Sequence, residues 1–500
     1  MNFDVVIIGS GAGLMLVEAA LAIGLKCALV EKSDFGGTCL TKGCIPSKML
    51  VYPADLIRET QSAERVGLKF APPEIDWQKI SDRMWKQINY SAKMEEGLLH
   101  TQNLTVFKGT GEFVSPDIMK VRSDGGVYSP AFQGSRFIIA AGARSFIPPV
   151  DGLERSGYLT YETFFGDKYP LEPWKSLVII GGGAIGCEFA HIFSALGTKV
   201  SLIEMNTRLL ATEEEEISAL VKKQFTANDV DVFIGAKAIS VSADEIGKTV
   251  IVEDIASGAK TKIVCDEVFI ASGIRSNGDT MKLENAGVSV DAKGWTKTNE
   301  LLETSQTNIW AIGDINGIYQ FRHKANREAE ILAHNLFGTP RAKKTMSYAS
   351  VPWAVFTWPQ VAHIGITESE AKSRGLSYRT GKNFYSMIAG GIAMGYSRHS
   401  GDDGFVKIIA GEDKTILGVH IVGPNAAILL QPFEYLMNAG YKCGANRNIF
   451  QKLIAEIQGM TLTSSPTGTY EPISDSMVIH PSLNELTAWV IDKIDWGDEN

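Results

Sequence analysis

The chain alternates short apolar runs with amphipathic stretches, and two of these alternations have the same order of parts. The apolar run from Phe3 to Ile8 ends in Gly9, a helix-like segment follows, and a second apolar run ends in Glu31. The run from Ser176 to Ile180 opens the same order, which ends in Glu204. A strand, a glycine turn, a helix and a second strand make a βαβ unit. The pattern therefore predicts two βαβ units and an α/β fold.

The remaining segments divide the rest of the chain. Residues 57–99 are charged with a helical period, residues 104–140 are short strand-like runs broken by glycines, and Pro148-Pro149 interrupts regular structure. Beyond residue 346, β-rich runs precede amphipathic helices. We expect domains over residues 1–148, 149–273, 274–345 (a return to the first domain) and 346–500.

The composition excludes several classes of protein. The chain has 500 residues, of which 45% are hydrophobic and 21% charged, as in a globular protein with more than one core. The net charge of -9 offers no electrostatic basis for binding nucleic acid or an anionic membrane. No apolar run reaches the roughly 20 residues of a membrane helix, and no signal-peptide pattern is visible. We therefore expect a cytoplasmic protein that acts on small molecules.

Both glycine turns have the chemistry of dinucleotide binding. Glycines let the backbone approach a pyrophosphate, the helix N-terminus offers N–H groups, and the acid after the second strand binds ribose hydroxyls. The first unit has Leu14 where the third glycine of the pattern is expected. The second unit has all three: Gly181, Gly183 and Gly186. Glu204 favours NAD, because a carboxylate repels the 2′-phosphate of NADP, while the nearby Arg208 keeps NADP open.

Two of the six cysteines lie close together in the sequence. Cys39 and Cys44 are separated by four residues, and Lys48 follows. This spacing allows a disulfide within one local turn, and a nearby cation stabilises a thiolate. The other four cysteines are scattered: Cys27, Cys187, Cys265 and Cys443. Because half a zinc site needs a second pair of ligands, we predict a redox pair and no metal.

These motifs together resemble the FAD-dependent pyridine nucleotide-disulfide oxidoreductases of the glutathione reductase and dihydrolipoamide dehydrogenase type. The resemblance is carried, in order, by residues 36–48, the two glycine units, Gly313-Asp314 and residues 480–485, and it covers nearly the whole chain. It implies a homodimer with FAD, NAD(P), central and interface domains. The predicted fold is therefore two Rossmann-like dinucleotide-binding domains plus an α+β dimerisation domain over 346–500.

The resemblance also implies roles for the redox residues. Cys44 is similar to the thiol that contacts the flavin and forms the charge-transfer thiolate, and Cys39 to the interchange thiol that attacks the substrate disulfide. His480 of the partner subunit is implied as the acid/base for Cys39, with Glu485 orienting the imidazole. Each active site is thus expected to contain residues of two chains.

The same resemblance implies the cofactor-binding residues. Lys48 and Glu188 match the ion pair beside the flavin N5 edge, Asp314 the acid on the ribityl hydroxyls, and Glu31 the acid on the adenosine ribose. The set expected around FAD is Gly9, Gly11, Gly13, Glu31, Lys32, Gly37, Thr38, Lys48, Gly111, Ala141, Gly142, Asp314 and His323. The set expected around NAD is Gly181, Gly183, Ile185, Gly186, Glu204 and Gly273.

The sequence gives less information about the substrate than about the cofactors. Glu204 and the Lys48/Glu188 pair suit an NAD-linked dihydrolipoyl dehydrogenase acting on dihydrolipoamide or on a lipoyl group of a carrier protein. Residues 48–54 and 189–197 resemble mycothione reductases instead. An NAD(P)H-dependent low-molecular-weight disulfide reductase, mycothione- or glutathione-reductase-like, is therefore an alternative. Mercuric reductase is disfavoured, because its vicinal C-terminal cysteine pair is missing.

A third possibility belongs to another class, a non-catalytic FAD/NAD electron-transfer subunit. Retention of both cysteines, His480 and Glu485 argues against it. The Thr-, Ser-, Gly- and Pro-rich stretch within residues 458–475 is interpreted as a loop that shapes the substrate mouth.

Overall fold

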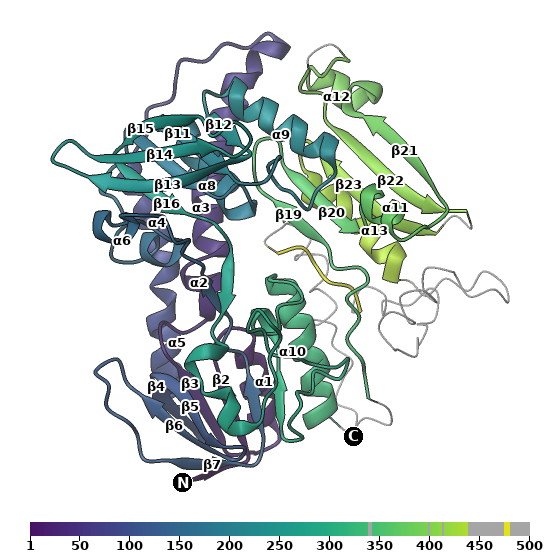
Figure 1. Ribbon diagram of the computed structural model, residues 1–500. Coiled ribbons are helices and arrows are strands. Elements are labelled where there is room, and N and C mark those ends of the chain that lie inside the picture. Colours follow the sequence, from purple (N-terminus) through teal and green to yellow (C-terminus); the bar gives the residue numbers. More distant parts are fainter. Residues whose placement is uncertain (339–342, 399–400, 413–414, 439–474, 481–500) are drawn as a thin grey trace. The chain divides into compact units, whose positions relative to one another are not determined.

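The computed structural model describes all residues except 339–342, 399–400, 413–414, 439–474 and 481–500 (Figure 1). The chain forms two compact units. The first consists of residues 1–47, 82–146 and 274–348, and the second of residues 48–81, 147–273 and 349–500.

A parallel five-stranded sheet forms the centre of the first unit. Its strands, in spatial order, are β18 (Ile309–Ala311), β8 (Phe137–Ile139), β2 (Val5–Ile8), β3 (Cys27–Glu31) and β4 (Leu104–Lys108). All residues of β2 and β3 are buried, as expected for a parallel sheet covered on both faces. Helix α1 (Gly13–Ala22) contacts β2 and β3, and also contacts α10 (Arg322–Phe337).

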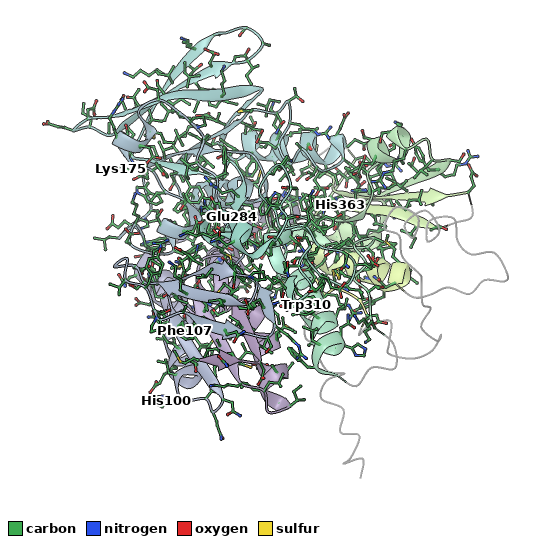
Figure 2. All side chains as sticks on the ribbon, turned by 60° about the horizontal axis from the view of Figure 1, so that its bottom comes forward. His100, Phe107, Lys175, Glu284, Trp310 and His363 are labelled. Carbon is green, nitrogen blue, oxygen red and sulfur yellow. The ribbon has the colours of Figure 1, made fainter. Side chains whose placement is uncertain are left out.

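A second sheet completes the core of the first unit. Its order is β1 (Asn2–Phe3), β7 (Phe132–Gly134), β6 (Ile118–Arg122) and β5 (Thr110–Ser115). The run from Phe3 to Ile8, predicted as one strand, is interrupted at Asp4, because β1 pairs with β7 while β2 joins the parallel sheet. Phe107 of β4, labelled in Figure 2, stacks on Phe132 of β7 with ring centroids 4.6 Å apart, so aromatic rings join the two sheets.

The second unit contains the other nucleotide-type sheet. Its parallel strands are β12 (Asp231–Ile234), β11 (Lys199–Glu204), β10 (Ser176–Ile180) and β16 (Glu267–Ile270). Helix α8 (Ala184–Ala195) contacts β11, and α9 (Glu215–Ala227) contacts β12. An antiparallel ribbon of β13 (Ala236–Ala243), β14 (Lys248–Asp254) and β15 (Lys260–Cys265) adds Val241, Val250 and Val252 to the core. The predicted pair of Rossmann-like domains is confirmed.

An antiparallel five-stranded sheet follows in the same unit. Its order is β19 (Trp353–Val355), β20 (Val361–Gly365), β23 (Ile416–Val422), β22 (Phe405–Gly411) and β21 (Tyr378–Phe384). Helix α13 (Ala426–Asn438) packs on β20 and β23 through a core that includes Ile364, Ile421 and Leu430 (Figure 1). The β-rich, α+β character predicted for the C-terminal domain is confirmed.

The remaining elements connect these sheets. They include α2 (Gly37–Thr41), α3 (Cys44–Ser62), α4 (Trp77–Ile88), α5 (Tyr90–Leu99), α6 (Leu153–Ser156), α7 (Tyr161–Phe164), α11 (Glu368–Ser373) and α12 (Ala389–Ala393). Strands β9 (Ala143–Ser145) and β17 (Ile274–Ser276) pair antiparallel where the chain leaves the first unit and where it returns. Within the described residues, no helix combines the length and the apolar character that a membrane span requires.

Candidate active site

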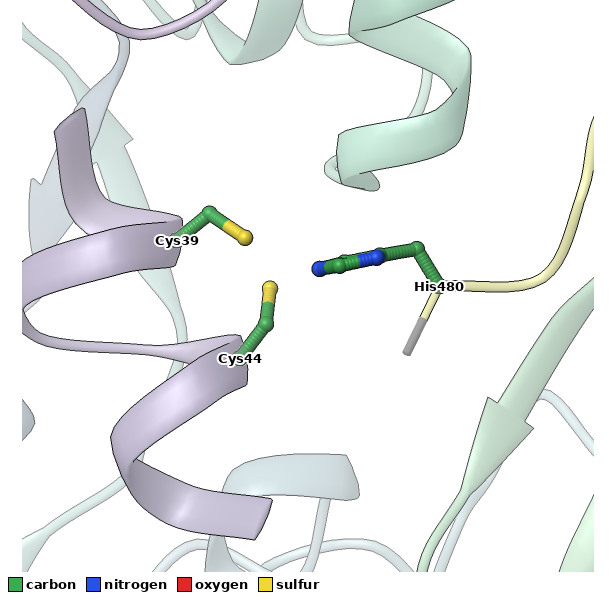
Figure 3. Close-up of side chains that lie close together, drawn as sticks. All are labelled: Cys39, Cys44 and His480. Atoms are coloured by element: carbon green, nitrogen blue, oxygen red, sulfur yellow. The ribbon is translucent and has the colours of Figure 1, made fainter. Parts of the chain in front are cut away.

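The two predicted redox cysteines lie at the junction of two helices. Cys39 belongs to the short helix α2, and Cys44 is the first residue of α3. Both side chains are half-buried, and their Sγ atoms point toward each other within 4.8 Å (Figure 3). Cys44 lies at the N-terminus of α3, where the positive end of the helix dipole stabilises a thiolate. The pair is therefore placed for reversible disulfide formation.

The other described cysteines have a different environment. Cys27, Cys187 and Cys265 are buried inside the two Rossmann-like domains. Burial raises the pKa of the Cys27 thiol to about 11 and that of Cys265 to about 11, and it raises the pKa of Cys187 further. Thiols held protonated in this way are poor nucleophiles. Cys443 lies outside the described residues.

Lys48 and Glu188 form an ion pair in the second unit. The Lys48 Nζ lies 2.7 Å from Glu188 Oε2, and the side chain of Glu188 is 10% exposed. The other carboxylate oxygen accepts the backbone N–H of Phe356 at 3.0 Å, and the Phe356 ring lies 4.6 Å from the ammonium. Lys48 lies one turn after Cys44 on α3. The ammonium is thus held by two contacts, and the Phe356 N–H fixes the carboxylate that pairs with it.

The glycine turn after β2 brings backbone segments into close contact. Gly9 has φ +103°, and a Cβ at this position would lie 2.2 Å from the Ala140 carbonyl oxygen. A Cβ on Gly37 would lie 2.6 Å from the Cα of Gly11. Only glycine allows both approaches, so the turn after β2 and the start of α2 touch through their backbones.

The place of the missing third glycine is taken by Gly13. A Cβ on Gly13 would lie 2.8 Å from the Cγ2 of Ile7 and 3.2 Å from the Cβ of Ala140. Gly13 is the first residue of α1, so the close packing of helix on strand occurs one residue before Leu14. Leu14 itself stays half-buried.

The turn after β10 has the same design with all three glycines. Gly181 has φ +116°, and a Cβ there would lie 2.2 Å from the Ala271 carbonyl oxygen. A Cβ on Gly186 would lie 1.8 Å from the carbonyl oxygen of Gly181. A Cβ on Gly183 or Gly273 would meet nothing within 4 Å, which leaves room for a dinucleotide at the start of α8. The predicted Ile185 lies half-buried in the first turn of that helix.

The two acids at the strand ends hold their glycine turns in the same way. Glu31 Oε2 accepts bonds from the N–H and the hydroxyl of Ser10 at 2.8 and 2.7 Å, and Oε1 accepts the N–H of Ser33 at 2.8 Å. Glu204 Oε2 accepts the N–H of Gly182 at 2.6 Å, and Oε1 that of Asn206 at 2.7 Å. Each carboxylate is fixed beside its turn and keeps lone pairs for ribose hydroxyls. Both acids are predictable from the sequence pattern, whereas Ser10, Ser33 and Asn206 belong to no motif and were not predicted.

Asp314 lies on a turn held by a buried ion pair that the sequence analysis also missed. Glu328 Oε2 accepts the N–H of Gly313 at 2.6 Å, and Lys324 Nζ donates to the Gly313 carbonyl at 2.9 Å. Lys324 and Glu328 have fully buried side chains, with their charged atoms 3.1 Å apart. Asn316 bonds to both. Burial raises the pKa of Asp314 to about 6. A hydroxyl group that donates a hydrogen bond to this carboxylate would compensate for the water that it has lost.

The other residues expected around FAD are distributed along the first unit. Thr38 and Lys32 are exposed, Ala141 and Gly142 are half-buried at the end of β8, and His323 is buried with its ring stacked on Phe321. Gly111 lies in the core of β5, where a Cβ would lie 2.9 Å from the Sδ of Met119. Open space at Gly142, the closely packed glycine turn and the buried acid near Gly313 fit a dinucleotide in this unit.

His480 belongs to the second unit, and Glu485 lies outside the described residues. Their roles toward Cys39 stay predictions, as do those of the cofactor-binding sets.

Comparisons with known proteins agree with this arrangement. The family model for pyridine nucleotide-disulphide oxidoreductases matches residues 3–329, and the model for their dimerisation domain matches residues 351–454.

The chain belongs to this oxidoreductase family.

Two curated relatives and one solved structure illustrate the relationship. Dihydrolipoyl dehydrogenase 3 of Haloarcula marismortui is 33% identical over 449 residues, covering 88% of this chain and 91% of the relative. Dihydrolipoyl dehydrogenase of Chlamydia muridarum is 33% identical over 438 residues, covering 86% and 89%. A Cu(II) complex of the HOCl-induced flavoprotein disulfide reductase RclA from Escherichia coli superposes with a TM-score of 0.76 at 25% identity, covering 99% and 100%.

The protein is therefore an FAD-dependent NAD(P)-disulfide oxidoreductase that uses FAD and NAD(H). In such an enzyme the protein itself supplies the redox-active cysteine pair, while FAD and NAD(H) are bound cofactors.

We expect Glu204 to set the nucleotide preference of this oxidoreductase. Replacing Glu204 by Gln removes the charge that repels a 2′-phosphate and weakens the acceptor for the NAD 2′-hydroxyl. The ratio of kcat/KM for NADPH to that for NADH should rise by about 10- to 100-fold, the scale of one charge-assisted hydrogen bond. Steady-state kinetics with both nucleotides measure this ratio. Glu253→Gln, which removes a surface partner of Lys237 in the ribbon, should leave it unchanged; an equal change in both variants would contradict the assignment.

Proposed function

We propose that this oxidoreductase is a dihydrolipoyl dehydrogenase, which oxidises dihydrolipoamide and reduces NAD. The observation that carries the proposal is Glu204, because its fixed carboxylate favours NAD, the nucleotide of lipoamide oxidation, over NADP. The names of the relatives from Haloarcula marismortui and Chlamydia muridarum support it. The substrate would be the free dithiol or a lipoyl group on a carrier protein.

The cysteine pair would perform the thiol chemistry by two exchanges. A thiolate of dihydrolipoamide attacks the Sγ of Cys39 in the Cys39–Cys44 disulfide, that S–S bond breaks, and Cys44 leaves as a thiolate. The second substrate thiolate then attacks the substrate sulfur bound to Cys39, which forms lipoamide and releases Cys39. Two electrons and two protons leave the substrate. Bound FAD would pass the two electrons from the dithiol to NAD.

Other side chains would manage protons and charge. We assign His480 of the partner subunit as the base that takes the substrate thiol protons, with Glu485 as the group that orients it. This assignment requires the homodimer that the matched dimerisation domain supports. The ammonium of Lys48, held by Glu188, would stabilise the negative charge that develops beside Cys44.

A second candidate is a low-molecular-weight disulfide reductase that runs the exchange in the opposite direction. It is favoured by the similarity to the disulfide reductase RclA over nearly the full length of both chains. Here the Cys39 thiolate would attack the disulfide substrate, and Cys44 would then release the second thiol by re-forming the enzyme disulfide.

One comparison of substrates separates the two functions. The FAD-loaded protein is assayed with dihydrolipoamide and NAD, and with lipoamide, glutathione disulfide and mycothiol disulfide with NADH or NADPH. A dihydrolipoyl dehydrogenase should give the highest kcat/KM with the lipoyl pair and NAD(H). A value at least tenfold higher with a hydrophilic disulfide would replace this function by the second candidate. Residues 458–475, the predicted substrate loop, lie outside the described residues.

A further inference from the structure

Three buried side chains of the second unit converge at a point that the thiol chemistry does not use. Glu213 lies two residues before the start of α9. His363 of β20, labelled in Figure 2, pairs with His420 of β23 across the antiparallel strands. Glu213 Oε2 lies 3.4 Å from His363 Nδ1 and 3.9 Å from His420 Nδ1. The three side chains are between 0% and 11% exposed.

The hydrogen bonds of the two imidazoles determine which nitrogen carries a proton. His363 Nε2 lies 2.8 Å from the Gly365 carbonyl oxygen, and His420 Nε2 lies 3.0 Å from that of Ile366. A carbonyl only accepts, so both Nε2 atoms are donors, and each neutral ring has its lone pair on Nδ1. Both lone pairs are directed toward the Glu213 carboxylate.

These atoms lack a hydrogen bond. Glu213 Oε2, His363 Nδ1 and His420 Nδ1 are buried without a hydrogen-bond partner of acceptable geometry in the described part of the chain. Three acceptors that face one another away from water are unfavourable unless a proton on one imidazole or a bound cation lies between them.

The ammonium of Lys407, which pairs with the adjacent Glu214, does not supply this charge. Lys407 Nζ is 2.6 Å from a carboxylate oxygen of Glu214 and 2.6 Å from one of Glu368. Among the described residues, the ion pairs of Glu213 are formed only with the two histidines. The buried carboxylate of Glu213 thus has imidazole nitrogens, and no permanent cation, as its neighbours.

We propose that Glu213, His363 and His420 bind a divalent cation of the zinc class. Imidazole nitrogen and carboxylate oxygen are the ligands that zinc takes, at bond lengths of about 2.0–2.2 Å, which places tetrahedral ligands roughly 3.3 Å apart. The three ligand atoms lie within 4.8 Å of one another. Each histidine also donates its other N–H to a backbone carbonyl, the usual support of a metal-bound imidazole. Water fills the fourth position.

The cation links the nucleotide-binding turn to the C-terminal sheet. The Glu213 N–H donates to the Leu210 carbonyl at 2.8 Å, and the Leu210 N–H donates to the Gly182 carbonyl at 2.9 Å, within the turn after β10. The metal therefore has a structural role and takes no part in the redox steps. This inference does not depend on which disulfide is the substrate.

Zinc binding to the FAD-loaded, full-length protein tests the proposal. A Cys39→Ser/Cys44→Ser background removes thiolate ligands. After incubation with zinc and desalting, metal analysis should find one zinc ion per chain, and zinc at 100 times its Kd should raise the temperature of unfolding by roughly 2–4 °C. Glu213→Gln in this background should weaken zinc binding at least about 100-fold, whereas His100→Ala, at an exposed histidine of the first unit, should not.

The outcomes are distinct even if one variant is unstable. His420→Gln serves as a second variant, and FAD content with circular dichroism identifies the folded ones. Loss of zinc binding in either folded variant supports the site. Absence of zinc binding in the background protein, or equal binding in Glu213→Gln and His100→Ala, overturns it and leaves a buried imidazole–carboxylate cluster.

Discussion

Replacing Cys44 by serine is expected to lower disulfide turnover by at least about 10³-fold while the protein keeps its FAD. A serine hydroxyl cannot form the S–S bond on which both exchange steps depend, and it is not ionised near neutral pH. The closely packed glycines and buried acids of the first unit, which fit FAD, are untouched by this substitution. The measurements are kcat with lipoyl and disulfide substrates, and the flavin absorbance per protein.

Two further variants control this result. Cys39→Ser should lose turnover as well, since Cys39 is the predicted interchange thiol. It should still give the long-wavelength absorption band with NADH that Cys44→Ser lacks. Cys265→Ala, which removes a buried thiol whose pKa is raised to about 11, should retain turnover. A Cys44→Ser protein that turns over at the parent rate would show that the electrons bypass the pair.

Replacing Glu328 by alanine is expected to destabilise the first unit by about 3–5 kcal/mol, the cost of leaving a buried charge without its partner. Lys324 would stay fully buried with its positive charge, and the N–H of Gly313 would lose its acceptor. Because the Gly313–Asp314 turn depends on these bonds, FAD affinity should fall together with stability. Release of flavin on heating should occur at least about 6 °C earlier.

The same helix provides the matched control for this substitution. Glu330 of α10 pairs with Arg327 at 3.1 Å, and its side chain is 49% exposed. Glu330→Ala should change stability by less than about 0.5 kcal/mol. A double variant, Lys324→Met/Glu328→Leu, removes both charges and should recover part of the lost stability. Equal effects of Glu328→Ala and Glu330→Ala would contradict the role assigned to the buried pair.

Local features of the sequence were sufficient to predict the two Rossmann-like domains. A strand, a glycine turn and an acid at the end of the next strand are consecutive in the chain, as at Gly181 and Glu204, so their geometry follows from short-range rules. The cysteine pair is local for the same reason. Leu14 was an apparent departure from the pattern, and Gly13 explains it, because Gly13 makes the close helix–strand contact, with Ile7 and Ala140, one position before Leu14.

Contacts between distant segments could not be predicted in this way. Lys324 and Glu328 are four residues apart on a helix, a spacing that is typical of an exposed pair, and only the packing of α10 buries them. The interruption of the first strand at Asp4 depends on the partner strand β7, about which the local sequence contains no information. His363 and His420 face each other only because β20 pairs with β23, and they are too far apart along the chain to form a local metal-ligand motif.

The pairing of β18 with β8 at the edge of the first unit's parallel sheet has a consequence for synthesis on the ribosome. The parallel sheet of the second unit uses strands from one continuous segment, Ser176 to Ile270, and its parts emerge together. The parallel sheet of the first unit needs β18, which is translated after that whole segment. The nascent N-terminal strands must therefore wait, with an unpaired edge at β8, until the inserted domain has been made. The sheet that contains the earliest residues of the chain is therefore among the last to be completed during synthesis.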